Sequence, residues 1–323
     1  MIKTYFYRHS DTSMHHDVDL TQLQTLLADE NNLLWVDLFD WQPRDLQWLG
    51  GLFSFHALAI EDCIYDSPRS KVDRYEGYDF FELHALRYNE DSDPEIASEE
   101  LNVFLGKNYV VTVHKKPIIS IGRIADVSRQ SPHYMTKGPD YLLYAIVDGI
   151  TDTYFPIIER ISARIDELEV EIYEHPALAI TEEFLSLKRT IVMMRRAIDP
   201  QRRIFSNLGT RYTFEVRKEN LPYYMDLTDH LERISDSIEV FRDLVSSAMD
   251  TYSSYGTAQT NEAIRVLTII TTLTATLTLI TGVWGMNVPL PFQHTWWCTA
   301  AIVVFMVGLG FWMIRVFRKR NWI

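Results

Sequence analysis

The stretch Val266–Trp284 constrains this chain most, because it contains no charged residue and no proline. At a rise of about 1.5 Å per residue, a helix of this length nearly crosses a hydrocarbon core of about 30 Å. Thr271, Thr274, Thr278 and Thr281 follow one another at helical spacing and share one face. A hydroxyl face suits a helix that packs on other helices or lines water. Alternatively, the hydroxyls simply bond to carbonyl groups of their own helix.

The end of this stretch is polar and cannot continue as a helix. Gly285-Met286-Asn287 is followed closely by Pro289 and Pro291, and Gly285 permits a tight turn. The sequence therefore predicts a first membrane helix over 264–287, with the Asn287 amide at its outer end.

A second apolar segment, 296–315, is followed by a basic tail over 316–323. Trp296 and Trp297 suit a membrane interface, and the basic tail predicts a cytoplasmic C-terminus. Two spans then place the N-terminus in the cytoplasm as well, which agrees with the lack of a signal-peptide core near Met1. We expect a multi-pass protein of the cell (inner) membrane, in contact with lipid, with a short external loop over 288–295.

Charge divides the chain into an acidic and a basic region. It has 31 basic and 44 acidic residues, but from residue 264 onward there are five basic residues and no acidic one. An acidic soluble region excludes nucleic acid as an expected partner and favours cations. Cys63 and Cys298 cannot build a disulfide framework or a cysteine metal site. With no phosphate-binding loop, nucleophile motif or zinc-hydrolase spacing, an enzyme is not expected.

Residues 1–138 predict one cytosolic α/β domain with a mixed sheet. The expected strands are Tyr5–Tyr7, Leu33–Leu38, Tyr78–Tyr88, Glu100–Leu105 and Tyr109–His114, and the expected helices are Leu20–Ala28 and Leu46–Phe53. Gly106-Lys107-Asn108 predicts a tight turn between the last two strands. His15-His16-Asp17 is interpreted as a solvated loop, because no partner ligand has suitable spacing to it.

Residues 139–210 predict an antiparallel helical hairpin. Its first helix should begin with Asp140 as N-cap and end near Pro176, and its second should run from Thr181 to about Leu208. The acidic run Asp166–Glu171 is interpreted as a solvated face. Acidic charges on the first helix and basic charges on the second suit their antiparallel contact.

Residues 221–263 predict a long stalk helix. Its apolar residues alternate spacings of four and three, as in helices packed lengthwise: Leu227, Leu231, Ile234, Ile238, Phe241, Val245, Ala248, Tyr252 and Tyr255. No proline lies between Pro222 and Pro289, so one helix can run from Pro222 to Gly285, with Gly256 as its weak point.

The run Asn261–Ile270, continuing to Gly285-Met286-Asn287, closely resembles the pore helix of the CorA family of divalent-cation (magnesium) channels. Ala59–Asp62 and Ser67–Asp73 are similar to the soluble domain of that family. The resemblance implies an α+β cytosolic domain, long stalk helices and a two-span α-helical membrane domain. It also implies a funnel-shaped homo-oligomer, a pentamer.

The resemblance assigns roles along the first span. The pore and selectivity positions are Thr271, Ala275, Thr278, Gly285, Met286 and Asn287, and the cytosolic gate is formed by Ile264 and Leu267. A ring of Asn287 amides would contact the waters of hydrated Mg²⁺ without gripping the ion, as conduction requires. Rings of the apolar side chains Ile264 and Leu267 could close the pore by dewetting.

The resemblance also implies regulatory magnesium bound between subunits. Asp148 and Asp226 match positions of such sites, and the acidic turn with Glu90 and Asp91 lies where similar acids contribute. Taken alone, each of these groups is more often an ordinary exposed carboxylate.

The chain departs from the family pattern twice: the first departure leaves the transported ion open, and the second preserves an interfacial aromatic side chain. The segment after Asn287, Val288–Phe292, lacks the acid that is common there, and Trp284 replaces a tyrosine. A zinc, cobalt or nickel transporter of the same superfamily is therefore an alternative. A membrane-anchored cation sensor that does not conduct is an alternative of another class.

Overall fold

The computed structural model describes residues 1–67, 69–89, 95–174, 178–207, 214–286, 295–320 and 322. These residues divide into two units, Met1–Met249 and Asp250–Ile323. The long helix α8, Leu221–Trp284, contributes residues to both units.

In the described part of the first unit, seven strands form one mixed sheet in the order β2-β1-β3-β7-β6-β5-β4. The strands are β1 Ile2–Arg8, β2 Ser13–His16, β3 Leu33–Phe39, β4 Lys71–Tyr75, β5 Tyr78–Tyr88, β6 Ile96–Gly106 and β7 Tyr109–His114. β3 and β7 pair in parallel, and the other neighbouring strands pair antiparallel. The predicted turn after Gly106 is confirmed, since Leu105 pairs with Val110 across it.

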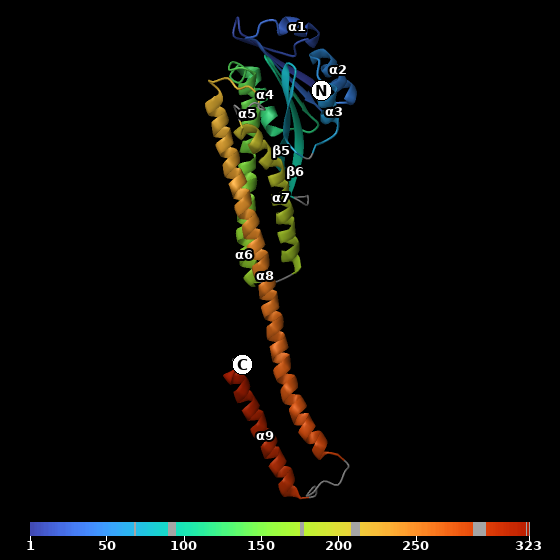
Figure 1. Ribbon diagram of the computed structural model, residues 1–323, viewed down its shortest axis with the longest axis vertical. Helices are drawn as coiled ribbons and strands as arrows, with labels where there is room; N and C mark the ends of the chain where they lie inside the picture. Colours follow the sequence, from blue (N-terminus) through green and yellow to red (C-terminus); the bar gives the residue numbers. More distant parts are fainter. Residues whose placement is uncertain are drawn as a thin grey trace. The chain divides into compact units, whose positions relative to one another are not determined.

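Helices cover both faces of the sheet (Figure 1). α2, Pro43–Phe53, and α3, Ala57–Ile64, pack on one face, around Phe80 and Phe104. α4, Ile119–Gln130, and α5, Pro139–Asp152, lie on the opposite side of the strands, together with α7, Leu178–Ser206. Burial on both faces explains why central strands are apolar at nearly every position instead of alternating.

Several elements of this domain differ from the sequence-based expectation. The predicted loop at His15 and His16 is wrong, because these residues form the edge strand β2 and pair with Phe6 and Tyr5. The helix expected over 20–28 is a short 3₁₀ turn, Leu20–Gln22, followed by α1, Leu23–Leu26. α3, β4 and α4 were not expected. α3 and β4 are short, with eight and five residues, and α4 has 12 residues and contacts β1 and β2.

The long helix expected from Asp140 is two helices, α5 and α6, Tyr154–Glu174. They are separated at Thr153, whose hydroxyl donates to the carbonyl of Ile150 at 2.6 Å. Asp140 is not the N-cap. Its buried carboxylate accepts hydrogen bonds from the Arg217 backbone N–H at 2.9 Å and the Asn220 amide at 2.8 Å. This carboxylate therefore ties the start of α5 to the start of α8. Pro176 lies outside the described residues.

The helices α6 and α7 contact each other, and one ion pair between them has the opposite sense to the expected charge pairing. Arg164 of α6 pairs with Glu183 of α7, with Nε to Oε1 at 2.6 Å. The run Asp166–Glu171 lies largely on a solvated face, as predicted. α7 begins at Leu178, three residues before the expected start at Thr181, and Leu208 lies outside the described residues.

The predicted long helix is confirmed by α8, which spans 64 residues and continues through Gly256. The seam positions in the first unit are buried: Leu227, Leu231, Ile234, Ile238, Phe241, Val245 and Ala248. Polar pairs flank the seam, with Ser235 donating to Asp199 at 3.2 Å and Arg195 lying 3.7 Å from Glu239.

The second unit contains the rest of α8 and α9, Trp296–Lys319. Both helices are long and apolar enough to cross a membrane. α9 continues through four residues of the tail expected at 316–323, so the first basic residues of that tail are helical.

We predict that Lys71→Met destabilises the protein by about 3 kcal/mol, because it leaves the buried carboxylate of Glu82 without the ammonium group that neutralises it. Glu82 is fully buried on β5, and its Oε2 lies 3.0 Å from Nζ of Lys71 on β4. Denaturant unfolding of the full chain in detergent, followed by tryptophan fluorescence, measures the change. Lys71→Arg should cost much less, and adding Glu82→Gln to Lys71→Met should restore part of the loss. An unchanged unfolding midpoint for Lys71→Met would contradict this account.

Candidate functional site

The residues expected to line a pore lie on exposed faces of α8 in the second unit. The described positions are Ile264, Leu267, Thr271, Ala275, Thr278, Gly285 and Met286, and each is exposed. A shallow groove runs along one side of the helix, past Thr271, Ala275, Thr278 and Met286. Asn287 lies outside the described residues.

The threonine hydroxyls bond to their own helix. Thr271 donates to the carbonyl of Leu267 at 2.8 Å, and Thr274 donates to that of Ile270 at 2.8 Å. A hydroxyl that donates its proton to a carbonyl of its own helix still has lone pairs, which accept hydrogen bonds from groups outside the helix. Back-bonding and an outward polar face therefore coexist at Thr271 and Thr274, which present acceptors rather than donors. The Thr278 hydroxyl makes no such bond among the described residues.

The last turn of α8 is tight at Gly285. The Gly285 N–H donates to the carbonyl of Thr281 at 2.9 Å. A Cβ at residue 285 would lie 3.1 Å from that same oxygen, closer than ordinary contact allows. Glycine at this position therefore lets the helix close its final turn immediately before Met286 and Asn287.

Acidic side chains and a histidine from α5 and α8 form a second candidate site, within the first unit. Ligand atoms of Asp148, Asp152 and His230 all lie within 4.8 Å of one another. His230 also lies between two acids, with Nδ1 at 3.8 Å from Asp148 Oδ1 and Nε2 at 3.8 Å from Asp226 Oδ2. The structure thus brings Asp148 and Asp226 to opposite sides of one imidazole.

Sequence reasoning identified Asp148 and Asp226 and missed Asp152 and His230. Each missed residue follows a found one by four positions in its helix, so it projects from the same face. That spacing was the available signal. Glu90 and Asp91, the other expected ligands, lie outside the described residues.

The electrostatics of this acid–histidine cluster favour a bound cation. Burial raises the pKa of the Asp148 carboxyl, and the negative charge of Asp152 raises it further, while His230 opposes the shift. Asp148 Oδ1 and His230 Nδ1 are buried and make no hydrogen bond within the described chain. A divalent cation would satisfy both atoms and remove the repulsion between the acids. Carboxylate oxygens suit Mg²⁺, and the imidazole adds affinity for Co²⁺, Ni²⁺ or Zn²⁺.

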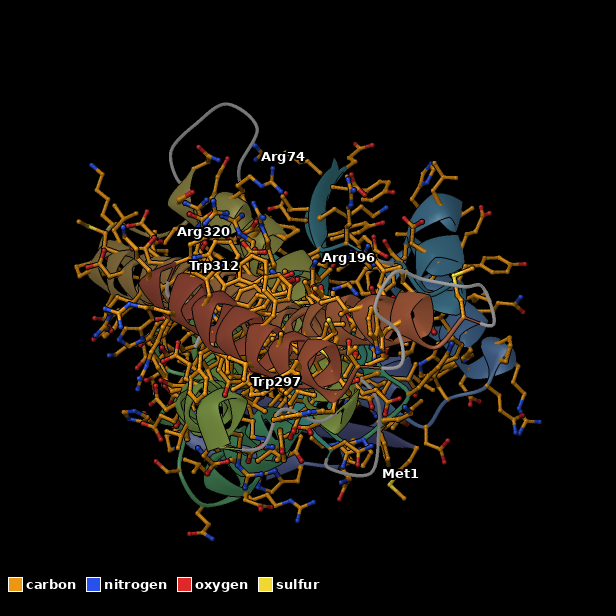
Figure 2. All side chains as sticks on the ribbon, turned by 90° about the horizontal axis from the view of Figure 1, so that it is seen from below. Met1, Arg74, Arg196, Trp297, Trp312 and Arg320 are labelled. Atoms are coloured by element: carbon orange, nitrogen blue, oxygen red, sulfur yellow. The ribbon has the colours of Figure 1, made fainter. Side chains whose placement is uncertain are left out.

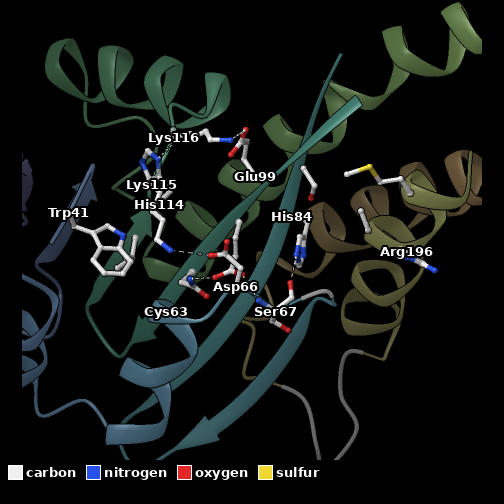
Figure 3. A pocket seen from close by; sticks show the side chains of 16 residues that line it. Trp41, Cys63, Asp66, Ser67, His84, Glu99, His114, Lys115, Lys116 and Arg196 are labelled. Carbon is white, nitrogen blue, oxygen red and sulfur yellow. Dashed lines mark hydrogen bonds and ion pairs between the residues drawn. The ribbon is translucent and has the colours of Figure 1, made fainter. Parts of the chain in front are cut away.

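A separate cavity of about 350 Å³ opens at one end of the sheet (Figure 3). Its lysines are matched to acids, with Lys115 Nζ 3.2 Å from Asp66 and Lys116 Nζ 3.0 Å from Glu99. The buried His84 ring contacts the Ser67 carbonyl at 2.8 Å, and burial lowers the pKa of His84. Because two of its acids are paired with lysines and Arg196 adds a positive charge to its wall, this cavity attracts a cation less than the acid–histidine cluster does.

Comparison with known proteins assigns the family. The family described as "CorA-like Mg2+ transporter protein" matches residues 30–319. The "Cobalt/magnesium transport protein CorA" of Thermotoga maritima is 33% identical over 312 residues, covering 94% of this chain and 88% of that protein. This chain belongs to the CorA family.

Two further comparisons agree with CorA membership. A "Putative metal ion transporter YfjQ" of Bacillus subtilis is 31% identical over 289 residues, covering 89% of each chain. The solved structure of a CorA magnesium transporter from Methanocaldococcus jannaschii superimposes with a TM-score of 0.83 at 22% identity, covering 100% of this chain and 99% of that one. The expected CorA fold is thereby confirmed: a mixed α/β domain, a long helix and a C-terminal apolar helix.

We predict that Asp148→Asn stabilises the CorA chain at neutral pH without divalent cations and abolishes stabilisation by Mg²⁺ or Co²⁺. The folded state raises the pKa of Asp148, so its charged form opposes folding at every pH above its unfolded pKa. A neutral amide at residue 148 removes this unfavourable charge from the folded state, and it is also a weaker metal ligand than a carboxylate. Thermal unfolding of the full chain, with chelator and then with each metal, measures both effects. Asp79→Asn, an acid outside the cluster whose pKa burial also raises, is the matched control and should keep the metal response.

Proposed function

We propose that this chain is a subunit of a divalent-cation channel that passes hydrated Mg²⁺ across the cell membrane and is gated by cytosolic Mg²⁺. Membership of the CorA family supports the ion class. The observation that carries the proposal is the exposed face of hydrogen-bond acceptors along α8, next to an apolar pair at Ile264 and Leu267.

Conduction requires several copies of the chain. One span cannot enclose a pore, whereas several copies of α8 around a symmetry axis can line one. Exposure of Ile264, Leu267, Thr271 and Thr278 in the single chain leaves this side of α8 available for such an axis. A homo-oligomer follows, and the family resemblance gives five as its subunit number.

The acceptor face matches the chemistry of hydrated magnesium. Mg²⁺ retains its waters, which turn their hydrogens outward and therefore need acceptors. Neutral oxygens for those waters come from back-bonded Thr271, from the Thr278 hydroxyl and from a ring of Asn287 amides. Neutral acceptors hold the ion weakly enough for it to leave, as a conducting site must. Rings of Ile264 and Leu267 form the apolar gate at the cytosolic end.

Regulation is assigned to the acid–histidine cluster. Cytosolic Mg²⁺ bound at Asp148 and Asp152, and at Asp226 on the other side of His230, neutralises these charges. Acids such as Glu90 and Asp91 of a neighbouring subunit complete the site. When Mg²⁺ falls, the unbalanced carboxylates repel one another and loosen the closed state. This placement requires both termini in the cytoplasm, in agreement with the basic residues that end α9.

We predict that Asn287→Ala lowers Mg²⁺ entry by at least about tenfold, since each subunit loses its amide contact with the ion's waters. Purified protein in liposomes loaded with a Mg²⁺ dye gives the flux. Thr276→Ala, on another face of α8, is the control and should conduct normally. If the wild-type protein is folded and oligomeric but transports no cation into the liposomes, the result would favour the interpretation as a cation sensor. Zn²⁺ entry that requires a proton gradient, without Mg²⁺ entry, would favour a zinc transporter.

We also predict that Asp226→Ala conducts like wild type but is inhibited much less by Mg²⁺ on the cytosolic side, because the regulatory site loses a ligand. His230→Ala should weaken inhibition by Co²⁺ more than inhibition by Mg²⁺, since imidazole prefers the softer ion. The same liposomes, with Mg²⁺ or Co²⁺ titrated on the cytosolic face, provide the measurement. Asp229→Ala, an exposed acid on the same helix, is the matched control. Unchanged inhibition in Asp226→Ala would remove this residue from the regulatory site.

A further inference from the structure

One face of α9 combines an apolar surface with a cluster of cations. Residues at spacings of three and four share this face, which we call the α9 lipid face: Val304, Gly308, Phe311, Trp312, Arg315, Arg318 and Lys319. All seven are exposed. Figure 2 labels Trp312 on α9 and Arg320, the first residue after this helix.

The cations of this face have no acidic partner in the described chain. No ion pair involves Arg315, Arg318 or Lys319 among the described residues, although Arg265 of the same unit is paired with Glu262. Three positive charges on one and a half turns repel one another unless an anion lies between them. The α9 lipid face therefore needs an anion from outside the described part of its own unit to neutralise these three charges.

The apolar half of the face has the shape that an acyl chain needs. Phe311 and Trp312 are 70% and 62% exposed, one turn before Arg315. Gly308 lies one turn earlier, and a Cβ built there meets no atom within 4 Å. Its missing side chain leaves a notch between Val304 and the two aromatic rings. An apolar notch that leads to a basic cluster matches a lipid, which has a chain at one end and a phosphate at the other.

We propose that the α9 lipid face binds an anionic phospholipid of the cytoplasmic leaflet. Arg315, Arg318 and Lys319 hold the phosphate-bearing headgroup, since guanidinium groups bind phosphate oxygens in pairs and the ammonium adds a point charge. The first acyl segment lies over Gly308, against Trp312. This inference rests on the membrane placement proposed above, but not on which ion is conducted.

An acidic helix of another copy is the competing occupant, and the chemistry of the face disfavours it. Such a helix would neutralise the three cations but would leave Val304, Phe311 and Trp312 uncovered. A lipid satisfies the charged and apolar parts together. Each Lys or Arg near an anionic membrane surface raises binding about fivefold, so three of them give strong headgroup selectivity.

Native mass spectrometry of the purified oligomer, given equal amounts of phosphatidylglycerol and phosphatidylcholine, tests the inference. Wild type should retain phosphatidylglycerol preferentially. The triple variant Arg315→Gln, Arg318→Gln, Lys319→Gln should lose that preference by about tenfold or more. The variant Arg315→Lys, Arg318→Lys, Lys319→Arg should keep it. An equal charge change in the first unit, Lys218→Gln, Arg233→Gln, Arg242→Gln, is the matched control and should also keep it.

A second variant tests the notch separately from the charges. Gly308→Leu should lower the number of retained lipids and leave the headgroup preference unchanged. Selectivity that survives in the triple glutamine variant would overturn the proposal, as would a loss of oligomer with selectivity intact, which would assign the cations to another copy. Because lipid retention in detergent needs no ion flux, a selective but non-conducting protein would refute the channel and leave this inference standing.

Discussion

Unbroken backbone hydrogen bonding through α8 is the constraint on which both candidate sites depend. The same helix carries Asp226 and His230 in the first unit and the exposed threonine face in the second. No proline interrupts it, and Gly256 costs only about 1 kcal/mol relative to alanine. The buried seam from Leu227 to Ala248 supplies far more than this through packing. The cluster and the threonine face therefore belong to one continuous helix, which ends at Trp284.

The two sites use opposite chemistry, and their proposed roles require the difference. The cluster around His230 gathers charged ligands, and burial with like charge opposes ionisation of Asp148 until a cation arrives. The threonine face offers neutral oxygens, and the hydroxyl protons of Thr271 and Thr274 are already donated to carbonyl groups of the helix. Charged ligands hold an ion long enough to report its concentration. Neutral acceptors that contact only its waters let it pass.

The distribution of charge extends the same division to the membrane. Acidic residues end before the first span, and the last turns of α9 carry cations that no described acid neutralises. The acidic part suits the binding of cations from the cytosol. The basic end suits the phosphates of a lipid leaflet, and it is the basis of the cytoplasmic C-terminus proposed above.

Strands and helices that depend on a local sequence pattern could be predicted from the sequence alone. β5 and β7 have the predicted bounds, and α8 follows from the absence of proline and from a repeat of 3.5 residues. The family was recognisable from a short motif at the end of the first span. Other features depend on contacts between distant parts of the chain. β2 forms because it pairs with β1, and the buried Asp140 carboxylate accepts a hydrogen bond from Asn220 instead of capping its own helix. The acid–histidine cluster required α5 and α8 to meet, because residues about eighty positions apart give no periodic signal of their contact.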